Sequence, residues 1–113
     1  MNSEAASLFA AHETEVRELC RKLFVARLDL FGSAAGPEWS ASSDLDFVVS
    51  FIETARQPGL ADRYLALAAG LESVLGRPVD LVTENSIRNP YFRKTVEATR
   101  HPIYAHGDAQ AAA

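Results

Sequence analysis

Two aspartates that stand two positions apart are the residues of this sequence best suited to chemistry. Asp44 and Asp46 lie at the start of the apolar segment Leu45–Phe51. If this segment is a strand, residues two apart project from the same face, about 6 to 7 Å apart along the chain. Two ionised carboxylates repel each other unless a cation lies between them. Mg²⁺, a hard ion that prefers oxygen ligands and phosphate partners, meets that need.

Two further features could complete such a site. Gly32 and Ser33 precede the aspartates by ten residues and follow the apolar segment 25–31. Glycine permits a close turn whose backbone can approach phosphate oxygens, although a Gly-Ser pair alone is common in ordinary turns. Asp80 lies in a second short apolar segment, 79–83, where a buried and unpaired charge would be costly. Asp80 is therefore a candidate third carboxylate, and a charge at the rim of a sheet is the alternative.

The pattern Gly-Ser-x10-Asp-x-Asp resembles the signature of the polymerase-β-like nucleotidyltransferase superfamily, and the short chain resembles its minimal, MNT-type members. The resemblance implies that Gly32 and Ser33 bind nucleotide phosphates. It also implies that Asp44 and Asp46 bind catalytic Mg²⁺, and that Asp80 completes the metal site and helps to deprotonate the acceptor. The reaction it implies is transfer of AMP from ATP to a hydroxyl group.

The same resemblance implies a partner. Minimal members often act as the antitoxin of a HEPN/MNT toxin–antitoxin pair, in which they neutralise a HEPN-type ribonuclease toxin. They do so by binding it or by adding AMP to a tyrosine. The expected function is therefore protein AMPylation by an antitoxin.

The segment after the Gly-Ser pair departs from the family pattern. Members commonly carry arginines there, whereas this sequence has Ala34, Ala35, Gly36 and Pro37. The departure weakens the expectation of high activity and keeps open a non-catalytic antitoxin that neutralises its partner by binding alone. A phospho-accepting receiver domain also uses clustered aspartates and Mg²⁺, but it fits poorly because the acidic pair here follows a Gly-Ser turn.

Helical and strand patterns alternate along the chain, which predicts an α/β fold. We expect a small sheet of three to four strands packed with helices, and the resemblance implies that the sheet is mixed. Helices are expected from Ser3, as the cap, to about Leu23, then over 60–75 before Gly76, and over 90–99 after the cap Asn89. Strands are expected over 25–31, 45–51, 79–83 and 102–105. Residues 1–106 would form one domain and 107–113 a flexible tail.

Several side chains have expected surroundings within these elements. Asp29, in the first strand, could be a site carboxylate, but a solvated strand position is the preferred expectation. Tyr91, Phe92 and Val96 should supply the apolar contacts of the last helix. Cys20 should be an unreactive packing residue on the first helix.

Size and charge exclude several classes of protein. With 113 residues, of which 48% are hydrophobic, the chain can build one core but not two. Its net charge of −4 argues against binding to duplex nucleic acid. No apolar run approaches the roughly 20 residues that span a bilayer, and no signal pattern is evident, so no membrane association is expected. A single cysteine fits a reducing cytoplasm. Homo- and hetero-oligomers both stay open.

Overall fold

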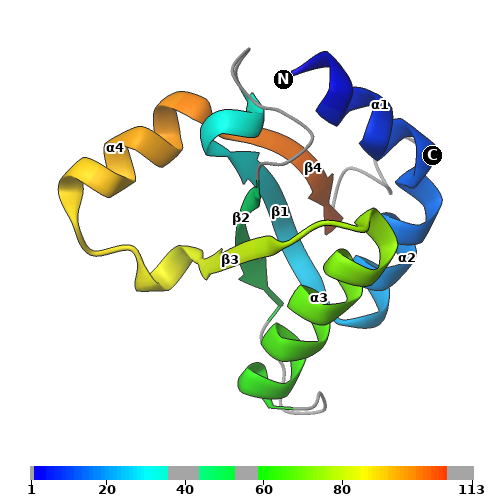
Figure 1. The fold of residues 1–113 in the computed structure, drawn as a ribbon. Coiled ribbons are helices and arrows are strands. Elements are labelled where there is room, and N and C mark those ends of the chain that lie inside the picture. The colour runs from blue at the N-terminus through cyan, green and yellow to red at the C-terminus, as the bar shows by residue number, and fades with distance from the viewer. Residues whose placement is uncertain (1, 36–43, 53–58, 107–113) are drawn as a thin grey trace.

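The computed structural model describes residues 2–35, 44–52 and 59–106. Its four strands form one sheet in the order β3-β2-β1-β4 (Figure 1). β1 pairs antiparallel with both β2 and β4, whereas β2 and β3 run parallel. The predicted small mixed sheet is therefore confirmed. In chain order the elements are α1 (Ser3–Ala11), α2 (Glu13–Lys22), β1 (Val25–Phe31), the 3-10 turn η1 (Gly32–Ala35), β2 (Leu45–Phe51), α3 (Leu60–Leu75), β3 (Val79–Thr83), the 3-10 turn η2 (Glu84–Ser86), α4 (Pro90–Thr99) and β4 (His101–Ala105).

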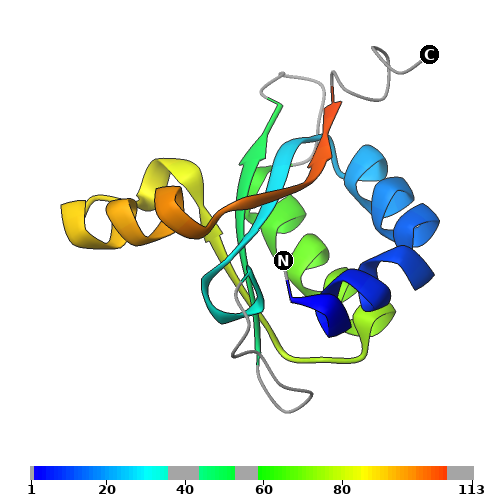
Figure 2. The ribbon, with the colours of Figure 1, turned by 90° about the horizontal axis from the view of Figure 1, so that it is seen from above.

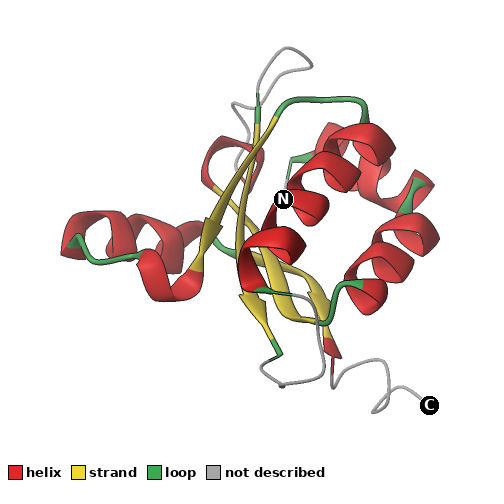
Figure 3. Ribbon diagram, turned by 90° about the horizontal axis from the view of Figure 1, so that it is seen from below, coloured by secondary structure: helices red, strands yellow, loops and turns green. Residues whose placement is uncertain are grey.

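Helices cover both faces of the sheet. α1, α2 and α3 lie on one face and α4 lies on the other, as the views from above and from below show (Figures 2 and 3). β2 divides its residues accordingly, because successive side chains of a strand point to opposite faces. Leu45, Phe47 and Val49 are buried in the main core beneath the three helices, whereas Val48 packs with Phe31 and Val96 of α4 in a second, smaller cluster.

The first helical region differs from its prediction. Two helices stand where one was expected, because His12 leaves helical geometry at φ −121° and ψ 18°. The cap is also one residue earlier than predicted. The side-chain oxygen of Asn2, rather than that of Ser3, accepts the backbone N–H groups of Glu4 and Ala5 at 2.8 and 3.3 Å.

The later elements begin and end close to where the sequence places them. α3 ends at Gly76, whose left-handed backbone closes the helix, and the Asn89 side chain caps α4 as expected. Val96 is buried as predicted and Phe92 is 36% exposed, but the expected packing of Tyr91 is wrong, since it is 82% exposed. The predicted tail, 107–113, lies outside the described residues.

No helix within the described ranges combines the length and the apolar character that a membrane crossing requires.

Candidate active site

Asp46 and Asp80 lie side by side on neighbouring strands. They are Cα partners in the parallel pairing of β2 with β3, and neighbouring strands are about 4.8 Å apart. Directly paired residues project from the same face of a sheet. That face is the one that carries Val48 and Val82, on the side of α4. Two carboxylates separated by 34 positions in the sequence are thus brought together.

The third aspartate of the predicted site adds its charge to this pair. Asp44 is exposed and lies directly before β2. The pKa of Asp46 is raised above its ordinary value, first by desolvation on burial and then by the charges of Asp80 and Asp44. The charges of Asp80 and Asp44 therefore both act on the half-buried Asp46.

The predicted Gly-Ser turn lies against Asp46. Phe31, the last residue of β1, is the Cα partner of Asp46, so the chain enters η1 beside that carboxylate. Gly32 has a left-handed backbone, with φ +76°. A Cβ placed on Gly32 would come 2.8 Å from Oδ2 of Asp46, closer than a carbon can approach. Glycine adopts the left-handed backbone without strain and leaves the Asp46 carboxylate undisturbed, which is a physical reason for its place in the motif. Ser33 follows as the second residue of η1, and the loop 36–43 lies outside the described residues.

One contact at this turn was not expected from the sequence. The backbone N–H of Gly32 donates to Oγ1 of Thr99, the last residue of α4, at 3.0 Å. The two residues are 67 positions apart, and no local pattern in the sequence links a helical threonine to a distant turn.

Asp29 was expected to be solvated, and this expectation is wrong. Its side chain is fully buried on the α4 side of β1, where Arg27 approaches Oδ2 at 2.7 Å and Arg100 at 2.6 Å. Arg100, only 11% exposed, also bonds Glu84 at 3.1 Å. Burial without a partner would be costly, and the two arginines remove that cost. Asp29 is thus a structural carboxylate whose partner, Arg100, lies 71 positions away.

Mg²⁺ fits the donor set at Asp46 and Asp80. Among the residues that the structure describes, no three side chains of His, Cys, Asp or Glu are grouped so that they alone could hold a metal ion. Mg²⁺ does not require such a group, because it is commonly bound by one or two carboxylates together with water and substrate phosphates. Two carboxylates at directly paired positions, of which Asp80 is exposed, suit that mode of binding.

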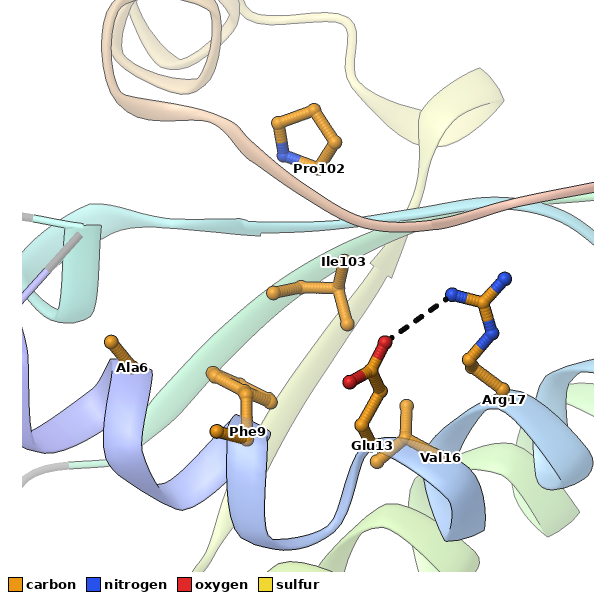
Figure 4. Close-up of a pocket in the computed structure, with 8 residues that line it drawn as sticks. Ala6, Phe9, Glu13, Val16, Arg17, Pro102 and Ile103 are labelled. Atoms are coloured by element: carbon orange, nitrogen blue, oxygen red, sulfur yellow. Dashed lines mark hydrogen bonds and ion pairs between the residues drawn. The ribbon is translucent and has the colours of Figure 1, made fainter. Parts of the chain in front are cut away.

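A separate hollow of about 230 Å³ lies between α1, α2 and β4 (Figure 4). Phe9 and Ile103 contribute to its apolar lining, and its charged residues Glu13 and Arg17 pair with each other at 3.5 Å. Its lining, among the described residues, contains none of the candidate site aspartates, so the hollow lies apart from the acidic pair.

Comparisons with known proteins agree with this geometry. Residues 13–101 match the family described as a nucleotidyltransferase domain, a range that contains every site residue named above. A candidate protein adenylyltransferase of Methanocaldococcus jannaschii is 39% identical over 92 residues, which are 74% of this chain and 90% of the relative.

Two solved structures share the fold. A protein described as a minimal nucleotidyltransferase superposes with a TM-score of 0.68 at 30% identity, over 90% of this chain and 96% of its own. A chain from the structure of a tri-AMPylated Shewanella oneidensis HEPN toxin in complex with an MNT antitoxin superposes with a TM-score of 0.58 at 21% identity. The match covers 90% of this chain and 76% of that chain. On the extent of these matches, the chain belongs to the nucleotidyltransferase domain family.

Proposed function

We propose that this chain is a Mg²⁺-dependent protein adenylyltransferase that transfers AMP from ATP to a hydroxyl group of a partner protein. The observation that carries the proposal is the placement of Asp46 beside Asp80, with the Gly32 turn packed against the Asp46 carboxylate. This arrangement brings a glycine turn and two carboxylates to one point of the sheet, which supports the proposal.

Each residue then has a distinct role. Asp44, Asp46 and Asp80 would hold Mg²⁺, which when bound offsets the charge of the donor phosphates as pyrophosphate leaves. Gly32 and Ser33 would hold the terminal phosphates of ATP through the turn. Asp80 is exposed, so it can meet an acceptor that arrives on another molecule.

The transfer requires one bond to form and one to break. The acceptor oxygen bonds to the α-phosphorus of ATP, the bond from that phosphorus to pyrophosphate breaks, and the hydroxyl proton passes to a carboxylate oxygen of Asp80. The products are an adenylylated partner and pyrophosphate.

The partner that we propose is a HEPN-type ribonuclease toxin, modified on a tyrosine in the cytoplasm, with this chain as its antitoxin. The fold shared with an MNT antitoxin bound to an AMPylated HEPN toxin supports this assignment. So does the similarity to a relative whose name describes a protein adenylyltransferase.

A second candidate function is neutralisation by binding alone. The absence of arginine from positions 34–37 favours it, because the family commonly uses arginines there to contact phosphates. The two candidates differ in whether the partner carries AMP.

Mass spectrometry of a HEPN-type partner co-expressed with this chain separates them. Asp46→Asn and Asp80→Asn remove charge with little change of shape, so we expect the partner to carry AMP with wild type and none with either variant. Asp62→Asn, at an exposed site on α3, is the matched control and should leave transfer intact. An unmodified partner that is nevertheless inhibited by wild type would refute catalysis and support the binding module.

A further inference from the structure

The turn that carries Gly32 is held from outside by α4. The backbone N–H of Gly32 donates to Oγ1 of Thr99 at 3.0 Å. The hydroxyl of Thr99 in turn donates to the carbonyl of Thr95, one helical turn earlier, at 2.8 Å. Because the single hydroxyl proton is used within the helix, the oxygen presents a lone pair to the turn. Thr99 can therefore act toward Gly32 only as an acceptor in this arrangement.

The end of α4 is itself fixed to the sheet. Arg100 follows Thr99 directly, and its guanidinium contacts Asp29 of β1 at 2.6 Å and Glu84 of η2 at 3.1 Å. Asp29 is fully buried, and a buried charge pair of this kind has few alternative arrangements. The backbone at Thr99 thus has little freedom to move relative to β1, so the position of its hydroxyl is determined by contacts outside the turn.

We propose that Thr99 is a positioning residue for the nucleotide-binding turn. It sets the direction of the Gly32 peptide and thereby the position of the turn relative to the Asp46 carboxylate. The inference rests on the proposed function to the extent that nucleotide phosphates bind at this turn.

The tight packing at Gly32 explains why one hydrogen bond matters here. Glycine has no side chain to restrict its backbone, and its left-handed conformation is one of several open to it. The Oδ2 atom of Asp46 lies 2.8 Å from the position that a Cβ on Gly32 would take, so the turn and the carboxylate are close neighbours and a rotated peptide would change their relative position. Binding sites lose function when groups move by about 0.5 Å from the productive geometry.

Thr95, on the same helix, provides the matched control for a threonine hydroxyl with a purely structural role. Thr95 also bonds back to its own helix, with Oγ1 donating to the carbonyl of Tyr91 at 3.1 Å. Such bonds within a helix are common for threonine and carry no functional meaning. Thr95→Val removes the helix bond alone, whereas Thr99→Val removes both the helix bond and the contact with the turn.

The test measures Mg²⁺-ATP binding by titration calorimetry with the purified chain, together with thermal unfolding. We expect Thr99→Val to bind about three- to tenfold more weakly than wild type, the loss expected for one hydrogen bond. Thr99→Ser keeps the acceptor and should restore wild-type affinity, and Thr95→Val should bind as wild type does. The amide of Gly32, followed by NMR, should exchange faster with solvent in Thr99→Val alone.

Two results would overturn the inference. Equal affinity of Thr99→Val and Thr95→Val would show that the contact does not position the turn. Tighter binding by Thr99→Val would show that Thr99 competes with phosphate for the Gly32 N–H. The binding measurement needs no partner protein, so it is independent of the test of AMP transfer. A wild-type chain that binds Mg²⁺-ATP but transfers no AMP to the partner would refute the proposed function, and the effect of Thr99→Val on binding could still be interpreted.

Discussion

Gly32→Ala tests whether the turn and the Asp46 carboxylate are in contact, and a second glycine provides the reference. Both Gly32 and Gly76 have left-handed backbones, with φ values of +76° and +68°. A Cβ on Gly76 would meet nothing within 4 Å, whereas one on Gly32 would meet Oδ2 of Asp46 at 2.8 Å. The two substitutions share the conformational cost and differ in the clash.

The expected magnitudes follow from these two terms. A left-handed alanine costs about 1–2 kcal/mol, which is the full expected loss for Gly76→Ala. Forcing an extra methyl group into a packed site typically adds about 1–3 kcal/mol, so Gly32→Ala should lose about 2–5 kcal/mol in total. Urea unfolding followed by circular dichroism measures both values.

A double-mutant cycle identifies the source of the extra loss. In an Asp46→Ala background the carboxylate is gone, so Gly32→Ala should cost no more than Gly76→Ala does. The reasoning fails if Gly32→Ala is as mild as Gly76→Ala in the wild-type background, because the turn would then yield without disturbing Asp46. It also fails if the extra cost persists after Asp46 has been removed.

Three shorter predictions concern charge and burial. Without Mg²⁺, Asp46→Asn should hold or slightly raise stability at neutral pH, because burial and neighbouring carboxylates raise the pKa of Asp46. Because the folded-state pKa of Asp46 is raised, the protonated carboxyl group of Asp46 contributes to stability below its ordinary pKa of 3.8. This contribution is lost as pH rises through the folded-state pKa. Urea unfolding should therefore show no advantage of the variant in acid. Asp29→Ala should cost about 3 kcal/mol, because Arg100 loses a buried partner, whereas Glu13→Ala at an exposed pair should cost under about 1 kcal/mol in the same assay. Cys20, whose pKa burial raises to about 12, should resist a thiol reagent until the chain unfolds, and rapid reaction of the native chain would contradict this.

Local patterns predicted the elements that hold the site. The alternation in β2 places Leu45 and Phe47 in the core and Asp46 on the opposite face, as the sequence indicates. The helix stop at Gly76 and the cap at Asn89 follow from residue types whose preferences do not depend on tertiary structure. The pairing of Asp46 with Asp80 was expected from the family resemblance, because no local rule determines the register of strands that distant.

The errors share a physical origin in long-range contacts. Asp29 resembles a solvated strand residue in the sequence, and only the fold shows that Arg100 covers it. Thr99 looks like an ordinary helical residue until α4 is packed beside η1. Tyr91 was expected to pack within the last helix, but its side chain is exposed to solvent. The roles of the site aspartates and of Ser33 stay predictions.

The strand order has a consequence for synthesis on the ribosome. β1 is an interior strand only when β4, which follows the other three described strands in the sequence, has paired with it. Until then β1 offers an open edge to other chains, which is a known route to aggregation. The bonds from Gly32 to Thr99 and from Asp29 to Arg100 span 67 and 71 positions, so they too cannot form until α4 and Arg100 have been synthesised. A chain that ended before α4 would therefore have β2 and β3 but neither a protected β1 nor the hydrogen bond that holds the Gly32 turn.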